Sequence, residues 1–141
     1  MQQIKNSRTV VVQLLFYQGS TSTVPINVGF ESDVMKLENV NILNTSSSTN
    51  NVSTVTISTQ LIPFNIICGF SYATFTNAAG TVIPSYQNIP YNMIFPLSKT
   101  VQGMYDFTLI PSNYNDVLFP ASIASLVLEV NLTLTFIEYK K

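Results

Sequence analysis

Apolar and polar residues alternate along the last part of the chain. From position 126 to position 136 every even position is apolar, while the odd positions 129–135 hold Glu, Asn, Thr and Thr. A strand places alternate residues on one face, whereas a helix would spread them around its circumference. Eleven residues at about 3.3 Å each extend over roughly 36 Å. We therefore predict a long central strand whose core face is formed by Leu126, Leu128, Val130, Leu132, Leu134 and Phe136.

Shorter segments with the same alternation predict further strands. Apolar and polar residues alternate over 24–30, 54–61 and 105–109, and a mostly apolar run over 64–70 also has strand character. Because Pro25 has no N–H to donate to a ladder, its strand either begins there or lies at a sheet edge.

The alternation changes phase between Met35 and Ile42. Met35 and Leu37 occupy odd positions, whereas Val40 and Ile42 occupy even ones. Shifting by one residue turns every later side chain to the opposite face of a strand. A β-bulge inserts such an extra residue, so the phase change predicts a bulge near Glu38-Asn39.

The segment Val10–Tyr17 is apolar at both odd and even positions and is interrupted only by Gln13. A strand that is apolar on both faces is normally covered on both faces. A β-sandwich of this size has one interior, so the second cover is either another subunit or a neighbouring segment of the chain.

Turn-forming residues separate these segments, and their spacing is typical of an all-β fold. Helical periodicity is absent apart from a short candidate turn over 121–124. We predict one domain over residues 1–141, folded as a single antiparallel β-sandwich of jelly-roll type. The predicted turns and loops cover 18–23, 31–33, 44–51, 77–80, 84–85 and 111–116.

Composition excludes several functional classes. The chain has no His and a single Cys, so it lacks His-dependent catalytic triads, His-ligated metals, zinc–thiolate clusters and internal disulfides. Its six basic residues are scattered apart from Lys140-Lys141, which argues against nucleic-acid binding. We expect no signal peptide, because the N-terminus is polar, and no membrane-spanning helix, because no apolar stretch approaches 18 residues.

The remaining candidates for chemistry each have a simpler structural explanation. Glu31 and Asp33 could form a carboxylate pair, but they fit a solvated turn. The run Asn113–Asp116 offers oxygen ligands without the spacing of a calcium loop. Cys68 is expected to be a buried, unreactive thiol. An aromatic platform for ligands or, alternatively, ordinary packing could use Tyr72, Phe75, Tyr86, Tyr91, Phe95 and Tyr114.

Charge is scarce and unevenly distributed. Charged residues form 9% of the chain, against roughly 25% in an average soluble domain. The sixty residues from 39 to 98 carry no charge at all. Because the centres of protein interfaces are depleted in charge, this distribution favours a chain that buries a large neutral surface against partners.

Two segments resemble proteins of known type. The stretch from Val28 to Val40, VGFESDVMKLENV, and the ending from Leu126 to Tyr139, preceded by Gly103–Phe107, resemble minor capsid or penton-type proteins. These belong to icosahedral DNA viruses with double-jelly-roll major capsid proteins. The resemblance implies a β-sandwich in the virion that assembles with other capsid proteins and with copies of itself, a pentamer at a vertex being one arrangement.

We predict a virion structural protein that is not an enzyme, and we assign it no catalytic, cofactor-binding or metal-binding residue. Two alternatives remain open. The first is a glycan-binding β-sandwich module of the receptor-binding or lectin type. The second is a glycan hydrolase, which needs two carboxylates about 5–9.5 Å apart in a groove. Its candidates are Glu31, Asp33, Glu38, Asp106, Asp116, Glu129 and Glu138.

Overall fold

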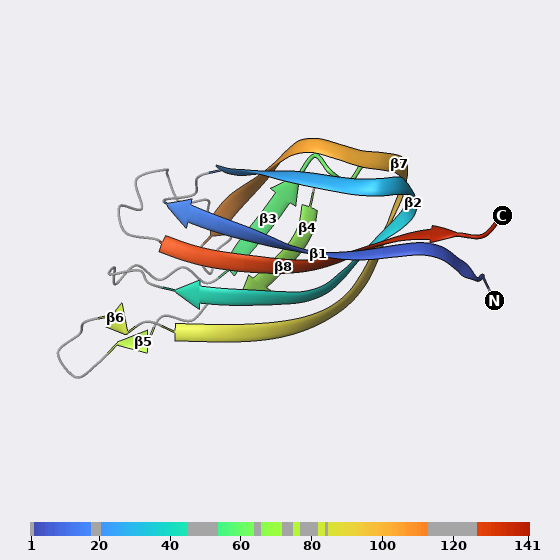
Figure 1. Ribbon diagram of the computed structural model, residues 1–141. Coiled ribbons are helices and arrows are strands. Elements are labelled where there is room, and N and C mark those ends of the chain that lie inside the picture. Colours follow the sequence, from blue (N-terminus) through green and yellow to red (C-terminus); the bar gives the residue numbers. More distant parts are fainter. Residues whose placement is uncertain are drawn as a thin grey trace.

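The computed structural model describes residues 2–17, 21–44, 54–63, 66–71, 75–76, 82–83, 85–112 and 127–141. All regular elements in these ranges are strands, as the sequence predicts (Figure 1). They are β1 (Ile4–Tyr17), β2 (Thr21–Asn44), β3 (Thr54–Thr59), β4 (Ile66–Ser71), β5 (Phe75–Thr76), β6 (Val82–Ile83), β7 (Ser85–Ser112) and β8 (Val127–Tyr139).

Six strands form one antiparallel sheet in the order β1-β8-β2-β7-β3-β4, and β5 pairs with β6. Strands β2 and β7 are long enough to bend over and contribute to two layers (Figure 1). The first layer contains β1, β8, β2 from residue 34 onward and β7 up to residue 96. The second layer contains β2 over 21–27, β7 from 102 onward, β3 and β4.

The pairing is nested along the chain. The six-stranded sheet has eight segments when each half of β2 and β7 is counted separately. In chain order, the first segment pairs with the last, the second with the seventh, the third with the sixth and the fourth with the fifth. A long antiparallel ribbon that pairs in this way and is rolled into two sheets is a jelly roll. The strand pairing therefore confirms the predicted jelly-roll sandwich.

Both long strands bend where they pass from one layer to the other. The β2–β7 ladder shifts between Asn27 and Glu31 and again between Ser32 and Val34. On the β7 side, Ser98 has a φ of 55° and Gly103 a φ of 131°. Glycine reaches that conformation without the steric penalty that a β-carbon brings, so Gly103 allows β7 to turn.

The phase change in β2 is a bulge, as predicted. The register of β2 shifts between Leu37 and Asn39 on both sides, against β7 and against β8. Met35 and Leu37 before the shift and Val40 after it are all fully buried. The bulge therefore keeps the apolar side chains of β2 in the core although their parity changes.

β8 lies between β1 and β2 and is the central strand of the first layer, as predicted. Leu126 lies outside the described residues, and the other five predicted core residues of this strand are fully buried. These β8 residues belong to a core that also includes Val12, Leu14 and Phe16 from β1, Ile57 from β3 and Phe107 from β7.

The layers are also joined by side chains at their open sides. The Ser22 hydroxyl donates to the Leu15 carbonyl at 2.9 Å and accepts from the Leu15 N–H at 3.2 Å. On the other side, the Tyr91 hydroxyl donates to the Gly69 carbonyl at 2.8 Å. Each contact links strands that share no backbone ladder.

Several turn predictions are wrong. Residues 21–23 belong to β2 and not to a loop, because Thr21 already pairs with Thr108. Residues 31–33 lie in β2, Ser85 begins β7 and residues 111–112 end it. The strand predicted over 54–61 is shorter in the structure, because residues 60–61 follow the end of β3. The first half of β7 is a strand that the sequence analysis did not predict. The predictions for 45–51, 77–80, 113–116 and 121–124 lie outside the described residues.

Truncating the central strand tests this packing. Leu132→Ala should lower the free energy of unfolding by about 2–5 kcal/mol, because it leaves a cavity in a fully buried site. Thr133→Ala on the opposite face should change it by less than about 0.5 kcal/mol. Chemical denaturation of the two variants measures the difference, and equal effects would contradict the assigned faces.

Candidate functional sites

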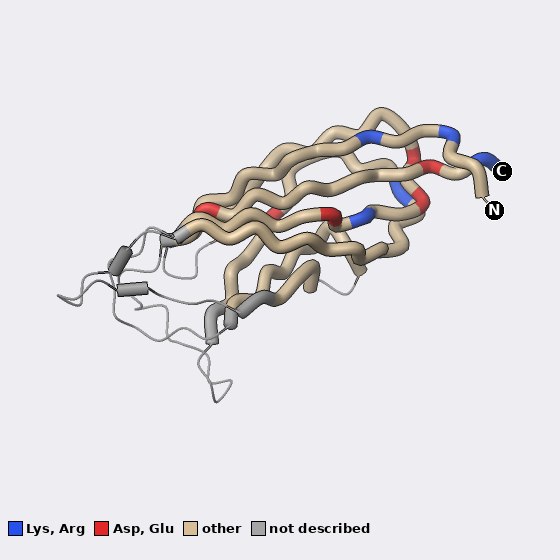
Figure 2. The backbone as a smooth tube through the Cα atoms, turned by 90° about the horizontal axis from the view of Figure 1, so that it is seen from below, with Lys and Arg blue, Asp and Glu red and all other residues tan. Residues whose placement is uncertain are grey.

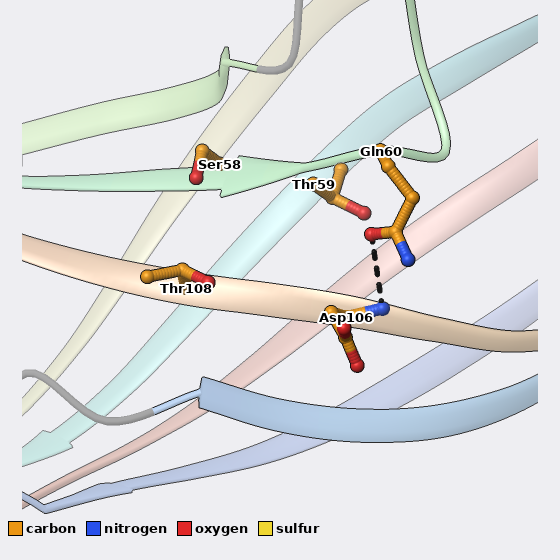
Figure 3. Close-up of a pocket in the computed structure, with 5 residues that line it drawn as sticks. All are labelled: Ser58, Thr59, Gln60, Asp106 and Thr108. Carbon is orange, nitrogen blue, oxygen red and sulfur yellow. Dashed lines mark hydrogen bonds between the residues drawn. The ribbon is translucent and has the colours of Figure 1, made fainter.

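A polar hollow of about 430 Å³ lies on the outer side of the second layer. It forms where the end of β3 passes beside β7, and Figure 3 shows its five lining side chains drawn from these two segments. The hollow is lined by Ser58, Thr59, Gln60, Asp106 and Thr108.

Hydrogen bonds hold the polar groups of the hollow in place. The side-chain amide oxygen of Gln60 accepts a hydrogen bond of 3.1 Å from the backbone N–H of Asp106 (Figure 3). The Thr23 hydroxyl donates to the Asp106 carboxylate, and the Thr21 and Thr108 hydroxyls share a hydrogen bond of 2.9 Å. The site therefore presents hydroxyl groups, an amide and one carboxylate, which suits a neutral, hydroxyl-rich ligand.

A second hollow of about 370 Å³ lies near the chain ends and contains Lys5, Glu138, Lys140 and Lys141. Among the described residues, each of the two hollows has one carboxylate. Their described linings therefore do not contain the carboxylate pair that glycoside hydrolysis requires.

Asp33 has a structural task. Its carboxylate accepts the backbone N–H of Tyr139 and the ammonium group of Lys141, both at 2.8 Å. The hydrogen bond from Lys141, followed by the one from Tyr139, lowers the pKa of Asp33 below its usual 3.8. The neighbouring Glu31 lies exposed on the same strand. Asp33 thus attaches the end of β8 to the bend of β2.

The chain itself orders its two ends. β1 begins at Ile4 and pairs with β8 as far as Tyr139, and the Lys140 N–H donates to the Gln3 carbonyl at 2.8 Å. Contacts within the chain therefore hold both of its described ends.

Cys68 is buried, as predicted. Its side chain is 3% exposed in β4, and loss of hydration raises its thiol pKa to about 12. The thiol is therefore protonated at neutral pH, where it is a poor nucleophile.

The proposed aromatic platform does not form among the residues that can be placed. Tyr86 is 66% exposed, whereas Tyr91 and Phe95 pack partly against the core. Burial raises the pKa of Tyr91, with the Cys68 thiol adding a smaller effect. The side chains of Tyr72, Phe75 and Tyr114 lie outside the described set.

Within the described ranges, no group of three or more His, Cys, Asp or Glu side chains could hold a metal ion. The run Asn113–Asp116 lies outside these ranges. No helix in this part of the chain is long and apolar enough to cross a bilayer.

The outer face of the first layer is a second candidate site. A row of amides crosses it, because Gln13 pairs with Asn131, Asn131 with Asn41, and Asn41 with Asn88. All four positions alternate with core-facing residues or are exposed. The row itself is uncharged, although Glu129, which accepts a hydrogen bond from Gln13, and the Lys36–Glu38 ion pair lie on the same face.

Exposed apolar side chains border this face. Val11 and Leu15 on β1 are 63% and 47% exposed, and Tyr86 and Ile94 on β7 are 66% and 60% exposed. The described segments thus do not cover the second apolar side of β1. Large exposed apolar side chains beside a neutral surface mark protein interaction sites.

Charged residues lie mostly toward the end that holds both termini, as Figure 2 shows. The charge-free segment 39–98 supplies β3, β4 and the first half of β7. Of these, β4 and the first half of β7 form the border of the sandwich where Tyr91 contacts Gly69. Residues 9–30 are a second charge-free run, which the sequence analysis missed although counting charges would have found it. This run includes most of β1 and the start of β2.

Comparisons with known proteins return structural likenesses only. No protein-family model matches the chain, and no curated protein matches it in sequence. A structure of infectious bursal disease virus, Gx strain, is 14% identical, with a TM-score of 0.45 over 96% of this chain and 33% of that chain. This chain therefore spans about a third of that protein's length.

Two further structures are more distant. That of mud crab tombus-like virus is 10% identical, with a TM-score of 0.31 over 99% of this chain and 93% of that chain. That of nora virus is also 10% identical, with a TM-score of 0.31 over 98% and 63%. The jelly-roll assignment accordingly rests on the strand pairing described above.

The role of Asp33 can be tested by pH. Asp33→Asn should reduce the hydrogen-exchange protection of the Tyr139 amide at neutral pH, because it removes the ion pair with Lys141. A lowered pKa means that the carboxylate stabilises the fold fully above about pH 4, and that this effect is lost as the pH falls through the lower, folded-state pKa. The difference between variant and parent should therefore vanish in acid.

Glu31→Gln is the matched control for this experiment. It removes a carboxylate from the same strand without removing an acceptor of the tail amide. Equal loss of protection in both variants would show that general charge, and not the Asp33 contacts, orders the C-terminus.

Proposed function

We propose that this chain is a structural protein of a virion, which assembles through the amide-rich and apolar parts of the outer face of its first layer. The jelly roll is a common architecture of viral capsid domains, but it also serves lectins and cupins. A fold alone does not define a function. The surface therefore has to support the assignment.

The observation that supports it is the combination of neutrality and exposed apolar side chains on one sheet face. Val11, Leu15, Tyr86 and Ile94 project from this face, and the amide row lies between them. Burying such a surface removes apolar area from water, and few ions lose their hydration. A chain that worked alone in solution would normally carry charge there.

The finer parts of the proposal follow from the sequence resemblance. They are a penton or minor capsid role, assembly into a homo-oligomer such as a pentamer, contact with other capsid proteins, and one domain over residues 1–141. We assign no enzymatic activity, cofactor, nucleic-acid contact or membrane span to this role.

A glycan-binding module is the second candidate, and the polar hollow favours it. Its hydroxyl groups, the Gln60 amide and the Asp106 carboxylate match the hydrogen-bonding pattern of a sugar. The described part of the hollow includes no aromatic ring on which a sugar could stack. For this reason we rank it below the structural role.

Assembly of the purified chain tests the main proposal. Electron microscopy and sedimentation velocity should show closed oligomers or shells. The double variant Tyr86→Lys/Ile94→Lys should raise the concentration needed for assembly at least about tenfold, because two charges would have to leave water. Gln102→Lys, an exposed position in the second layer, should assemble like the parent. A stable monomer at high concentration would refute the proposal.

A glycan array tests the second candidate. We expect no binding by the parent chain. Binding that is lost in Asp106→Asn, but retained in the surface variant Glu31→Gln, would favour the glycan-binding module over the structural role.

A further inference from the structure

The side of β1 that faces away from β8 has backbone groups without a ladder partner among the described residues. Leu15 uses its N–H and its carbonyl on Ser22, so both point away from β8. Backbone groups of successive residues alternate between the two sides of a strand, so those of Thr9, Val11 and Gln13 point the same way as those of Leu15. The 2.9 Å contact between the hydroxyls of Thr9 and Thr135 agrees, because side chains approach most closely in a pair without backbone hydrogen bonds.

β1 is the least protected border of the two layers. Proteins guard sheet edges with proline, charge, bulges or short strands. The border segment of β2 contains Pro25, the border segment of β7 contains Pro90 and Pro96, and β4 is six residues long. From Thr9 to Tyr17, β1 has no proline, glycine or charge. Among the described segments only β8 forms a ladder with it.

We propose that β1 pairs antiparallel with β1 of a second copy of this chain, with Val11 opposite Val11 and Thr9 opposite Gln13. This pairing satisfies the free backbone groups of all three residues. It joins the first layers of two copies into one continuous sheet and covers Val11, which is 63% exposed in the single chain. The pairing stops at Leu15, where Ser22 already occupies the edge.

The charge distribution favours a second copy in the antiparallel orientation. The paired stretch is neutral, so two identical strands meet without repulsion. The arm formed by residues 2–8 and 137–141 carries four basic residues and one acidic residue, a net charge of +3 that Asp33 and Glu31 beside Lys141 reduce to +1. Antiparallel pairing brings this arm toward the far end of the partner's β1, where Glu129 lies beside Leu15. A parallel arrangement would place two basic arms together.

The β1 pairing deepens the proposed function, because its use as a contact between subunits of a shell rests on the virion role. The pairing itself is a property of the isolated chain. It can therefore be tested separately from shell formation.

Cysteine cross-linking tests the pairing and its register. In a hydrogen-bonded antiparallel pair the Cα atoms are about 5.5 Å apart, within the range for a disulfide. Val11→Cys should form a covalent dimer under mild oxidation on a non-reducing gel. Gln13→Cys should not, because the proposed register separates the two copies of that residue by about four residues, or roughly 14 Å. The parent, with buried Cys68 alone, is the background control.

Val11→Pro tests the backbone contacts. The N–H of Val11 has no partner in β8, so proline removes no ladder bond within the chain. Association measured by sedimentation should weaken at least about tenfold, whereas Val11→Thr, which keeps the N–H and the branched shape, should associate within a few-fold of the parent. Should Val11→Pro fail to fold, the cross-linking pattern decides.

The outcomes separate the two proposals. Shells that form while Val11→Cys fails to cross-link overturn β1 pairing and leave the structural role intact. Equal cross-linking by Val11→Cys and Gln13→Cys also overturns the proposed register. Specific cross-linking by Val11→Cys, with neither shells nor closed oligomers larger than a dimer, supports the pairing and contradicts the virion role.

Discussion

The antiparallel pairing of the two chain ends is the interaction on which the rest of the structure depends. β1 and β8 are separated by more than a hundred residues, yet they pair from Asn6 to Tyr17 without a break in register. β8 then provides the edge on which the second half of β2 pairs, and β2 in turn positions β7. Closing so long a loop is entropically unfavourable, and the buried side chains Val130, Leu132 and Leu134 provide the compensating burial.

The bends and the bulge solve a geometric problem that this pairing creates. β2 and β7 must serve both layers, so each has to change direction without losing its partner. The irregularities near Ser32 and Ser98 lie at this bend, and the bulge near Glu38 restores the facing of the later residues. Because the strands continue through the bend, the two layers share strands and are also joined by the Ser22 and Tyr91 hydroxyls.

Neutral edges connect the architecture to assembly. A jelly roll leaves strand borders open on both sides of the sandwich, and a protein that stays monomeric has to protect them. Here proline residues protect the borders of β2 and β7, while charge gathers near the chain termini (Figure 2). β1 keeps neither device between Thr9 and Tyr17. The same stretch carries the exposed side chains of Val11 and Leu15.

The sequence by itself determined the features that depend on local alternation. It identified the core face of β8, the bulge near Glu38-Asn39 and the burial of Cys68, since each follows from the residues of one strand. For Pro25 it left a strand start and a sheet edge open, and the structure places it at an edge. It also determined the all-β class. It missed the first half of β7, because Pro90, Pro96 and exposed apolar residues obscure the alternation there.

Only the tertiary structure decided which segments meet. The polar hollow combines Gln60 with Asp106, and the C-terminal tail is attached by Asp33, contacts that span 46 and 106 residues along the chain. Residues 31–33 resemble a solvated turn when only their own polar side chains are considered. Their place at the bend of a continuous strand depends on pairing with β7 and β8. Which side of β1 stays open is likewise set by the side on which β8 pairs with it. Alternation fixes the face of a side chain, but the partner of a strand depends on long-range pairing that no local pattern contains.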